Sequence, residues 1–174
     1  TKGSATLFEK DMIKVMQMLV DLEMKIFRGL NVKVVFLQNI VTDLLLGFGV
    51  KEVFVAYHAY IKDKYGVEPG FVSMNLPRLV EFLFECGIEN PIVCSSINKA
   101  GYFMNPSIEA YESVIQEKPF RPIAMSVLAS GAILPEEAIA YVCRQPEIQS
   151  VVFGASSRTH IAETKKLIDK HSVL

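Results

Sequence analysis

The sequence predicts a single α/β domain built around a parallel β-sheet. Short apolar segments that suit buried strands alternate with longer segments in which apolar residues recur every three or four positions, as in amphipathic helices. After one leading helix, this alternation continues through five strand–helix units of roughly thirty residues, the pattern of a parallel sheet covered by helices on both faces. Because no change of composition marks a linker, we expect residues 1–174 to form one domain.

Two ways of closing such a sheet fit the pattern. The first is the C-terminal part, about five βα units, of a (β/α)8 or TIM barrel, which needs about 250 residues in all. The alternative is an open, doubly wound, flavodoxin-like sheet, which five strands complete. The pattern alone leaves open whether the chain is a fragment of a larger barrel.

The first part of the chain supplies two predicted helices and one predicted strand. Residues 8–28 place Met, Leu and Ile at helical spacing and end before Gly29, a common residue just past a helix. Residues 33–37 contain VVFL, a run typical of a strand. Residues 50–65 are rich in strand-forming types, but their apolar residues recur at helical spacing and predict a helix that ends at Gly66.

The rest of the chain repeats the strand–helix unit four times. Each predicted helix begins or ends at a Pro, Gly, Asn, Ser or acidic residue that suits that position. The predicted strands are residues 71–73, 91–97, 122–128 and 151–153, and the predicted helices are residues 76–86, 105–116, 134–144 and 159–170.

Composition and charge exclude several functional classes. The formal net charge is −1, which favours neither nucleic acid nor an anionic membrane as a partner. No apolar run approaches the ~18 residues that a membrane span needs. Cys86, Cys94 and Cys143 are odd in number and have no CxxC spacing, which indicates reduced thiols in a cytoplasmic protein. Because no His has a second ligand at metal-binding spacing, we expect no metal site.

Four stretches resemble a known family of enzymes. GFVSMN at 70–75, PIVCSSINKAGY at 91–102, IAMSVLASG at 123–131 and SVVFGASSRTHIAET at 150–164 follow one another as in the C-terminal portion of the aldo-keto reductases. These stretches look like the fifth to eighth strands of that (β/α)8 barrel. The resemblance implies an oxidoreductase that uses NADP or NAD, although the catalytic Tyr, Asp and Lys of the family come from strands that precede the matched segment.

The resemblance assigns roles to four residues at strand ends. Gln38 falls where the family has its catalytic His; a Gln can donate a hydrogen bond to a carbonyl but is no equivalent proton donor. Ser73 and Asn75 fall near the pair that holds the nicotinamide amide, and Met125 falls where an aromatic residue stacks on the nicotinamide. The hydride-transfer residues of the family are therefore not matched.

Two turns of small residues suggest an anion site. In barrels, phosphate commonly binds after the seventh and eighth strands, at the start of a helix. Here these turns leave backbone N–H groups open to a ligand, and we expect one phosphate-binding patch there; the alternative is two ordinary turns with a helix cap. The residues concerned are Gly131, Gly154, Ala155, Ser156, Ser157, Arg158 and His160, of which Gly154 and His160 occupy the family's 2′-phosphate-selecting positions.

Lys99 is the candidate nucleophile. It follows the strand 91–97, and a Lys held there among apolar walls would lose hydration, lower its pKa and attack a carbonyl. Class I aldolases of the same fold carry a Schiff-base Lys on the sixth strand, so the chain is similar to them in this respect. The alternative is an exposed loop Lys, or one paired with Asp43 or Glu109.

Three functional hypotheses result, and the sequence does not decide whether the protein is an enzyme. The first is an aldo-keto reductase-like or related barrel enzyme, or half of one, that binds a phosphate-bearing small molecule or nicotinamide nucleotide. The second is a non-catalytic interaction module derived from a barrel, and the third is an aldolase with Lys99 at its centre. Because a five-strand arc leaves sheet edges exposed, we also expect an oligomer or a partner chain that completes the barrel.

Overall fold

The computed structural model describes the backbone of residues 2–172 and the side chains of residues 9–172. Within these residues a five-stranded sheet forms, all of its strands are parallel, and their order follows the chain. This result confirms the predicted α/β class and the sequential order of the strands. The strands are β1 (Val34–Leu37), β2 (Glu68–Ser73), β3 (Ile92–Ser96), β4 (Arg121–Met125) and β5 (Ser150–Val151).

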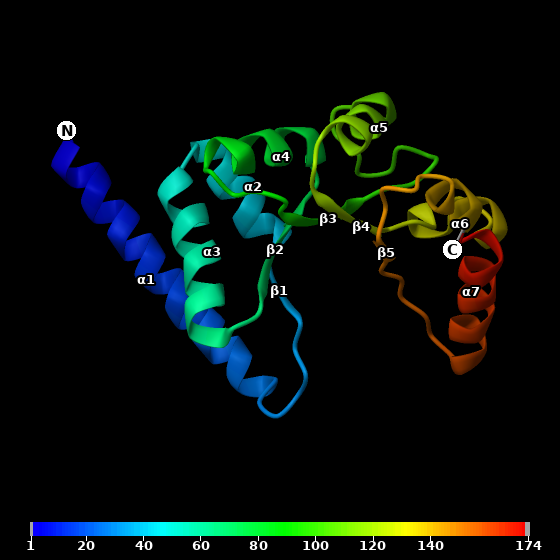
Figure 1. Ribbon diagram of the computed structural model, residues 1–174, viewed down its shortest axis with the longest axis horizontal. Coiled ribbons are helices and arrows are strands. Elements are labelled where there is room, and N and C mark those ends of the chain that lie inside the picture. Colours follow the sequence, from blue (N-terminus) through cyan, green and yellow to red (C-terminus); the bar gives the residue numbers. More distant parts are fainter. Residues whose placement is uncertain (1, 173–174) are drawn as a thin grey trace.

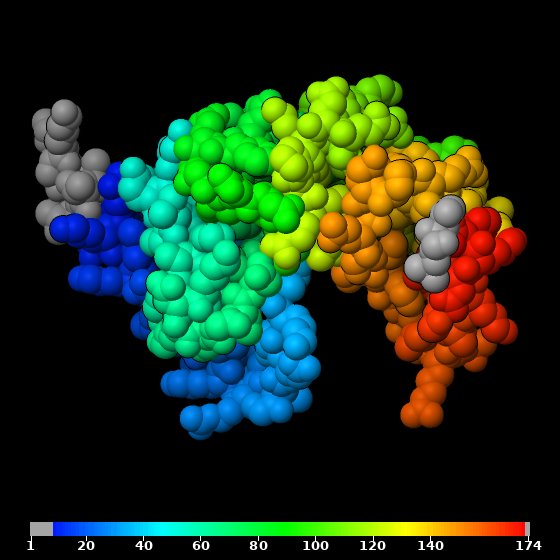
Figure 2. Space-filling model, viewed as in Figure 1, coloured from blue at the N-terminus to red at the C-terminus, as the bar shows by residue number. Residues whose placement is uncertain are grey.

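The helices lie along the outer side of an arch whose inner side is the sheet (Figure 1). α1 stands at one end of the arch and α7 at the other, and a wide notch separates these two ends in the space-filling view (Figure 2). The helices are α1 (Lys2–Ile26), α2 (Asn39–Phe48), α3 (Lys51–Tyr65), α4 (Leu76–Glu85), α5 (Ile108–Glu117), α6 (Pro135–Cys143) and α7 (Arg158–His171), with a 3₁₀ turn, η1, at Ala129–Gly131.

The core lies between the sheet and the helices. Phe71 of β2 points at α3, where its ring centroid lies 5.7 Å from that of Phe54. Phe54 also contacts Phe82 of α4, with centroids 5.1 Å apart. The Oη of Tyr57, which is fully buried on α3, donates a hydrogen bond to the carbonyl of Val35 at 2.7 Å. The buried face of α3 thus explains why helical spacing prevails over the strand propensity of this segment.

The other face of the sheet, on the inner side of the arch, brings two strands close together at a glycine. Side chains alternate along a strand, so Gly70 and Val72 face away from α3. Gly70 lies in register with Phe36 of β1, and a Cβ at this position would come within 2.5 Å of the Phe36 ring. A glycine is therefore required by the packing and not by the backbone angle.

A polar cluster ties α1 to α3. The Asp21 carboxylate accepts hydrogen bonds from the Oη of Tyr60 at 2.7 Å, the Oη of Tyr65 at 2.5 Å and the Nζ of Lys64 at 2.6 Å. The bond from Lys64, followed by those from the two tyrosines, holds the pKa of Asp21 well below its usual range. Burial and the bond to Asp21 raise the pKa of Tyr65 to about 12.

The structure differs from the sequence-based expectation after β1. Residues 39–48 form helix α2, for which no helix was predicted, so Thr42 and Asp43 lie on a helix. The Oγ1 of Thr42 donates to the carbonyl of Leu37 at 3.1 Å. α2 was missed because apolar residues stand on its solvent side too: Ile40 and Phe48 are each 67% exposed, which hides the helical periodicity.

Two strand boundaries were also predicted wrongly. β2 begins at Glu68, before the Pro69-Gly70 pair that indicates a turn, because pairing with β1 keeps these residues extended. β4 ends at Met125 because Ser126 adopts a φ of 54°, which leaves the strand conformation.

Candidate functional site

A hollow of about 300 Å³ lies where β4 and β5 end. This volume is at the lower limit of small-molecule sites. One wall comes from the end of β4 and the loop after it, and the other from the segment after β5. The lining residues are Met125, Ser126, Val127, Leu128, Ser130, Val152, Phe153 and Gly154.

The wall from β4 is a tight loop of small residues. Ser126, Ala129 and Ser130 have positive φ values of 54°, 46° and 57°, and Gly131 follows at 89°. Two backbone hydrogen bonds hold the loop: the N–H of Ala129 donates to Ser126 at 2.9 Å, and the N–H of Gly131 donates to Leu128 at 2.8 Å. The loop therefore presents a defined backbone surface to the hollow.

The wall from β5 presents unpaired backbone donors. The N–H of Val152 donates to the carbonyl of Ala124 at 2.8 Å, and sheet pairing ends there. Across residues 2–172, the next four N–H groups, those of residues 153–156, donate to no protein acceptor. Two of these residues, Phe153 and Gly154, line the hollow, and their backbone N–H groups can donate to the oxygens of an anion there.

The start of α7 is capped by the serines that precede it. The Oγ of Ser157 accepts a hydrogen bond from the backbone N–H of His160 at 3.2 Å. The Oγ of Ser156 lies 3.2 Å from the Nδ1 of His160, and Arg158 is exposed in the first turn. Of the predicted anion patch, Gly154 lines the hollow, and Gly131 belongs to the loop that forms the opposite wall without lining it. The other members of the patch, Ala155, Ser156, Ser157, Arg158 and His160, do not line the hollow.

Ser73 and Asn75, the predicted nicotinamide-binding pair, are engaged in internal contacts. Ser73 is fully buried; its Oγ donates to an Asp43 carboxylate oxygen at 2.5 Å and accepts from the N–H of Asn75 at 2.9 Å. The side chain of Asn75 caps α4 by accepting from the N–H of Arg78 at 3.3 Å. The Oγ of Ser73 and the Oδ1 of Asn75 are therefore both used in contacts within the protein.

The end of β2 is fixed by a buried polar layer. The Oγ of Ser95 donates to the carbonyl of Ser73 at 2.6 Å, and the Oη of Tyr111 donates to the carbonyl of Met74 at 2.9 Å. Burial raises the pKa of Tyr111. This layer holds the carboxyl ends of β2 and β3 together, and the hydroxyl groups of Ser95 and Tyr111 form their hydrogen bonds with protein atoms.

Lys99 and Gln38 lie outside the hollow. Lys99 forms an ion pair with Glu137 of α6, and both side chains are about half exposed. The ammonium group thus lies in water beside a carboxylate, not among apolar walls, and its partner is neither Asp43 nor Glu109. Gln38 is exposed at the N-cap of α2, where its backbone carbonyl accepts a hydrogen bond from the N–H of Thr42 at 2.9 Å.

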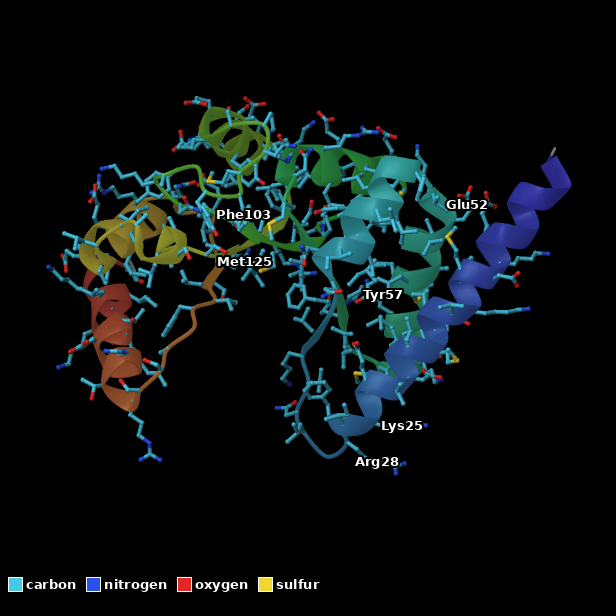
Figure 3. All side chains as sticks on the ribbon, turned by 180° about the vertical axis from the view of Figure 1, so that it is seen from behind. Lys25, Arg28, Glu52, Tyr57, Phe103 and Met125 are labelled. Atoms are coloured by element: carbon cyan, nitrogen blue, oxygen red, sulfur yellow. The ribbon has the colours of Figure 1, made fainter. Side chains whose placement is uncertain are left out.

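Met125 lines the hollow from the inner side of the arch. It is the last residue of β4, in register with Ser96 of β3, and Figure 3 shows it near the middle of the arch, far from Lys25 and Arg28 at the end of α1. The sequence pattern indicated Met125, Gly154 and the small-residue turn that contains Ser130 and Gly131, but not Ser126 or Phe153. Ser126 and Phe153 lie inside the predicted strands 122–128 and 151–153, so neither was expected in a wall of a loop.

Metal-ligating side chains and the buried thiol are the other candidate groups in the described part of the chain. Among the described residues, no three His, Cys, Asp or Glu side chains gather as metal ligands. Cys94 is buried, and its burial raises the pKa of the thiol to about 11, which disfavours a thiolate. No helix in the described part of the chain is long and apolar enough to cross a lipid bilayer.

Comparisons with known proteins give no relative from which a role could be taken. No protein-family model matches the sequence, no curated protein matches it, and no solved structure matches. The resemblance to aldo-keto reductases therefore depends on the four sequence stretches alone.

Proposed function

We propose that the chain is five consecutive βα units of a (β/α)8 barrel that binds a phosphate-bearing small molecule where β4 and β5 end. The observation that carries the proposed ligand is the hollow between the two loops, with unpaired N–H groups along one wall. Phosphate oxygens are the acceptors that such consecutive N–H groups bind best.

The strand order supports the barrel over the doubly wound alternative. In a doubly wound sheet the order reverses once, at the point where the ligand binds. In this sheet the order runs from β1 to β5 without reversal, as in a barrel. Three further units, from a longer chain or from a partner, would be needed to close it.

The groups in and near the hollow favour some of the candidate ligands over others. The Oγ of Ser73 and the Oδ1 of Asn75 make contacts within the protein, which favours a ligand held by its phosphate group over one held by a nicotinamide amide. Lys99 is paired with Glu137 and exposed, so the aldolase hypothesis has no supporting observation here. We therefore propose phosphate recognition without assigning a reaction.

Calorimetric titration with inorganic phosphate and with NADP tests this proposal. Gly154→Val places a branched side chain in open space beside the hollow and should weaken phosphate binding at least tenfold without affecting the fold. Arg158→Ala should weaken binding in a salt-dependent way if Arg158 reaches the bound anion. Gly47→Val and Arg144→Ala are matched controls at exposed positions of α2 and after α6.

Each outcome of the titration has a clear meaning. Binding of phosphate and NADP with similar affinity supports a site for the phosphate group alone. NADP binding much tighter than phosphate would show that the nicotinamide nucleotide has a site of its own. No binding of either at millimolar concentration contradicts the proposed ligand and leaves two ordinary turns.

A second candidate is a non-catalytic interaction module. One observation favours it: α1 carries exposed Leu22 and Ile26, which are 59% and 78% accessible. Large apolar side chains left in water on one face of a helix mark a surface that contacts another protein.

A further inference from the structure

The outer side of α1 is apolar and uncovered within the described structure. Five apolar residues on this side have side chains that are between 48% and 78% exposed, and we call them the α1 stripe. The opposite side of the helix, with Met16 and Val20, is buried against the body of the protein. The α1 stripe consists of Val15, Met18, Leu19, Leu22 and Ile26.

The α1 stripe extends over about three turns of the helix. Phe27 and Leu30, which follow the helix, line a hollow with Met24 and Tyr65 on the other side of α1 and do not belong to the stripe. Five large apolar side chains that lie in water along one helix face mark a surface that contacts another protein.

We propose that a second copy of this chain covers the α1 stripe, with the two α1 helices antiparallel about a twofold axis. Val15, Leu19, Leu22 and Ile26 follow intervals of four, three and four residues, the spacing of a coiled-coil seam. This series reads the same in both directions. An antiparallel second copy therefore sets Val15 against its Ile26 and Leu19 against its Leu22, the self-complementarity that a twofold interface requires.

The two ends of the arch differ in a way that favours this arrangement over stacking of copies end to end. α7, at the other end, exposes Lys165, Lys166 and Asp169 and carries no comparable apolar stripe among its described residues. Contacts between an apolar end and a charged end would be unfavourable, whereas contacts between two apolar ends bury both. None of the residues that line the hollow belongs to α1, so this inference does not depend on the proposed ligand.

Light scattering and sedimentation equilibrium test the association. The wild-type chain should have twice its 19.4 kDa mass. Leu22→Glu should raise the dissociation constant at least tenfold, because it puts a charge into the seam. Leu44→Glu, at a Leu of α2 that is equally exposed, is the matched control and should leave the dimer intact.

Disulfide crosslinking tests the orientation. Val15→Cys and Ile26→Cys are made separately in a chain whose partly exposed Cys86 and Cys143 are replaced by Ser. The mixture of the two variants should crosslink on oxidation, while each variant alone should not. A stable monomer would overturn the proposal and leave the stripe free for a closing helix of the barrel. A dimer that Leu22→Glu does not weaken, or crosslinking of Val15→Cys with itself, would also overturn it.

Discussion

Asp21 shows at the scale of a residue how a surface carboxylate can join two helices. Its two oxygens receive three donors from α3, and two of these are tyrosine hydroxyls that lie beside the Lys64 ammonium. The Nζ of Lys64 also lies 4.9 Å from the centroid of the Tyr60 ring. No periodicity in the sequence predicts this cluster, since Asp21 and Lys64 are far apart in the chain.

We predict that Asp21→Asn lowers the thermal stability of the protein near pH 7. The folded-state pKa of Asp21 is depressed below an unfolded value of about 3.9, so its stabilisation is present above that pH and is lost as the pH falls through the folded-state pKa. The melting-temperature difference between wild type and variant should be constant above about pH 5 and shrink below about pH 4. Asp63→Asn, which removes a carboxylate from an exposed position of the same helix, is the control and should leave the melting temperature at pH 7 close to that of the wild type.

Gly70 makes the second prediction at this scale. Gly70→Ala forces a methyl group against the Phe36 ring and the Val34 side chain, and should destabilise the fold by about 1–3 kcal/mol. Phe36→Ala removes the obstacle, so the double variant should be more stable than the sum of the two single effects predicts. Urea unfolding of the four proteins measures this coupling, and strict additivity would contradict the clash.

At the scale of an element, helix α4 begins at a residue for which two different roles have been suggested, a helix cap and a cofactor contact. Its N-cap, Asn75, is one of the two residues that the family resemblance assigns to a nicotinamide. An N-cap side chain satisfies a backbone N–H that the helix itself leaves unpaired. The two roles have different consequences when the side chain is removed.

We predict that Asn75→Ala lowers the free energy of unfolding by about 1 kcal/mol and leaves phosphate binding unchanged. Asn75→Asp should restore most of the stability, because Asp caps a helix about as well as Asn. Chemical denaturation and the calorimetric titration are run on the same samples. A variant that keeps its stability but loses affinity for NADP would show that Asn75 contacts the cofactor instead.

Helices α2 and α3 show where element prediction succeeds and where it stops. α3 buries one face, so Phe54, Tyr57 and Ile61 repeat at helical spacing and the helix could be predicted in spite of its strand-forming residues. α2 has large apolar residues on both its buried and its exposed face, so the spacing of apolar residues in the sequence does not show which face is buried. An exposed apolar side chain such as Phe48 cannot be distinguished from a buried one in the sequence, so it does not reveal which face of the helix lies in the core.

At the scale of the whole molecule, the sheet could be predicted because each strand is short, apolar and followed by a helix. The hollow could be predicted only in part. The turn at Gly154 was visible in the sequence, but the meeting of Phe153 with Ser126 and Ser130 depends on how β4 and β5 pair. The internal use of Ser73 could not be predicted either, because its partner Asp43 stands on the helix that the pattern did not reveal.

The two apolar sides of α1 have a consequence for synthesis on the ribosome. α1 is translated before β1, α2 and α3. Its inner side therefore stays uncovered until α3 has been made, and its outer side stays uncovered until a second molecule binds. At roughly 5–20 residues per second, the first of these periods is on the order of seconds, during which a helix with Leu, Ile and Met on both sides is exposed in the nascent chain. Such a segment is the natural binding target of a chaperone that protects apolar surface during translation, and crowded ribosomes on one messenger would bring two such helices together before either chain is finished.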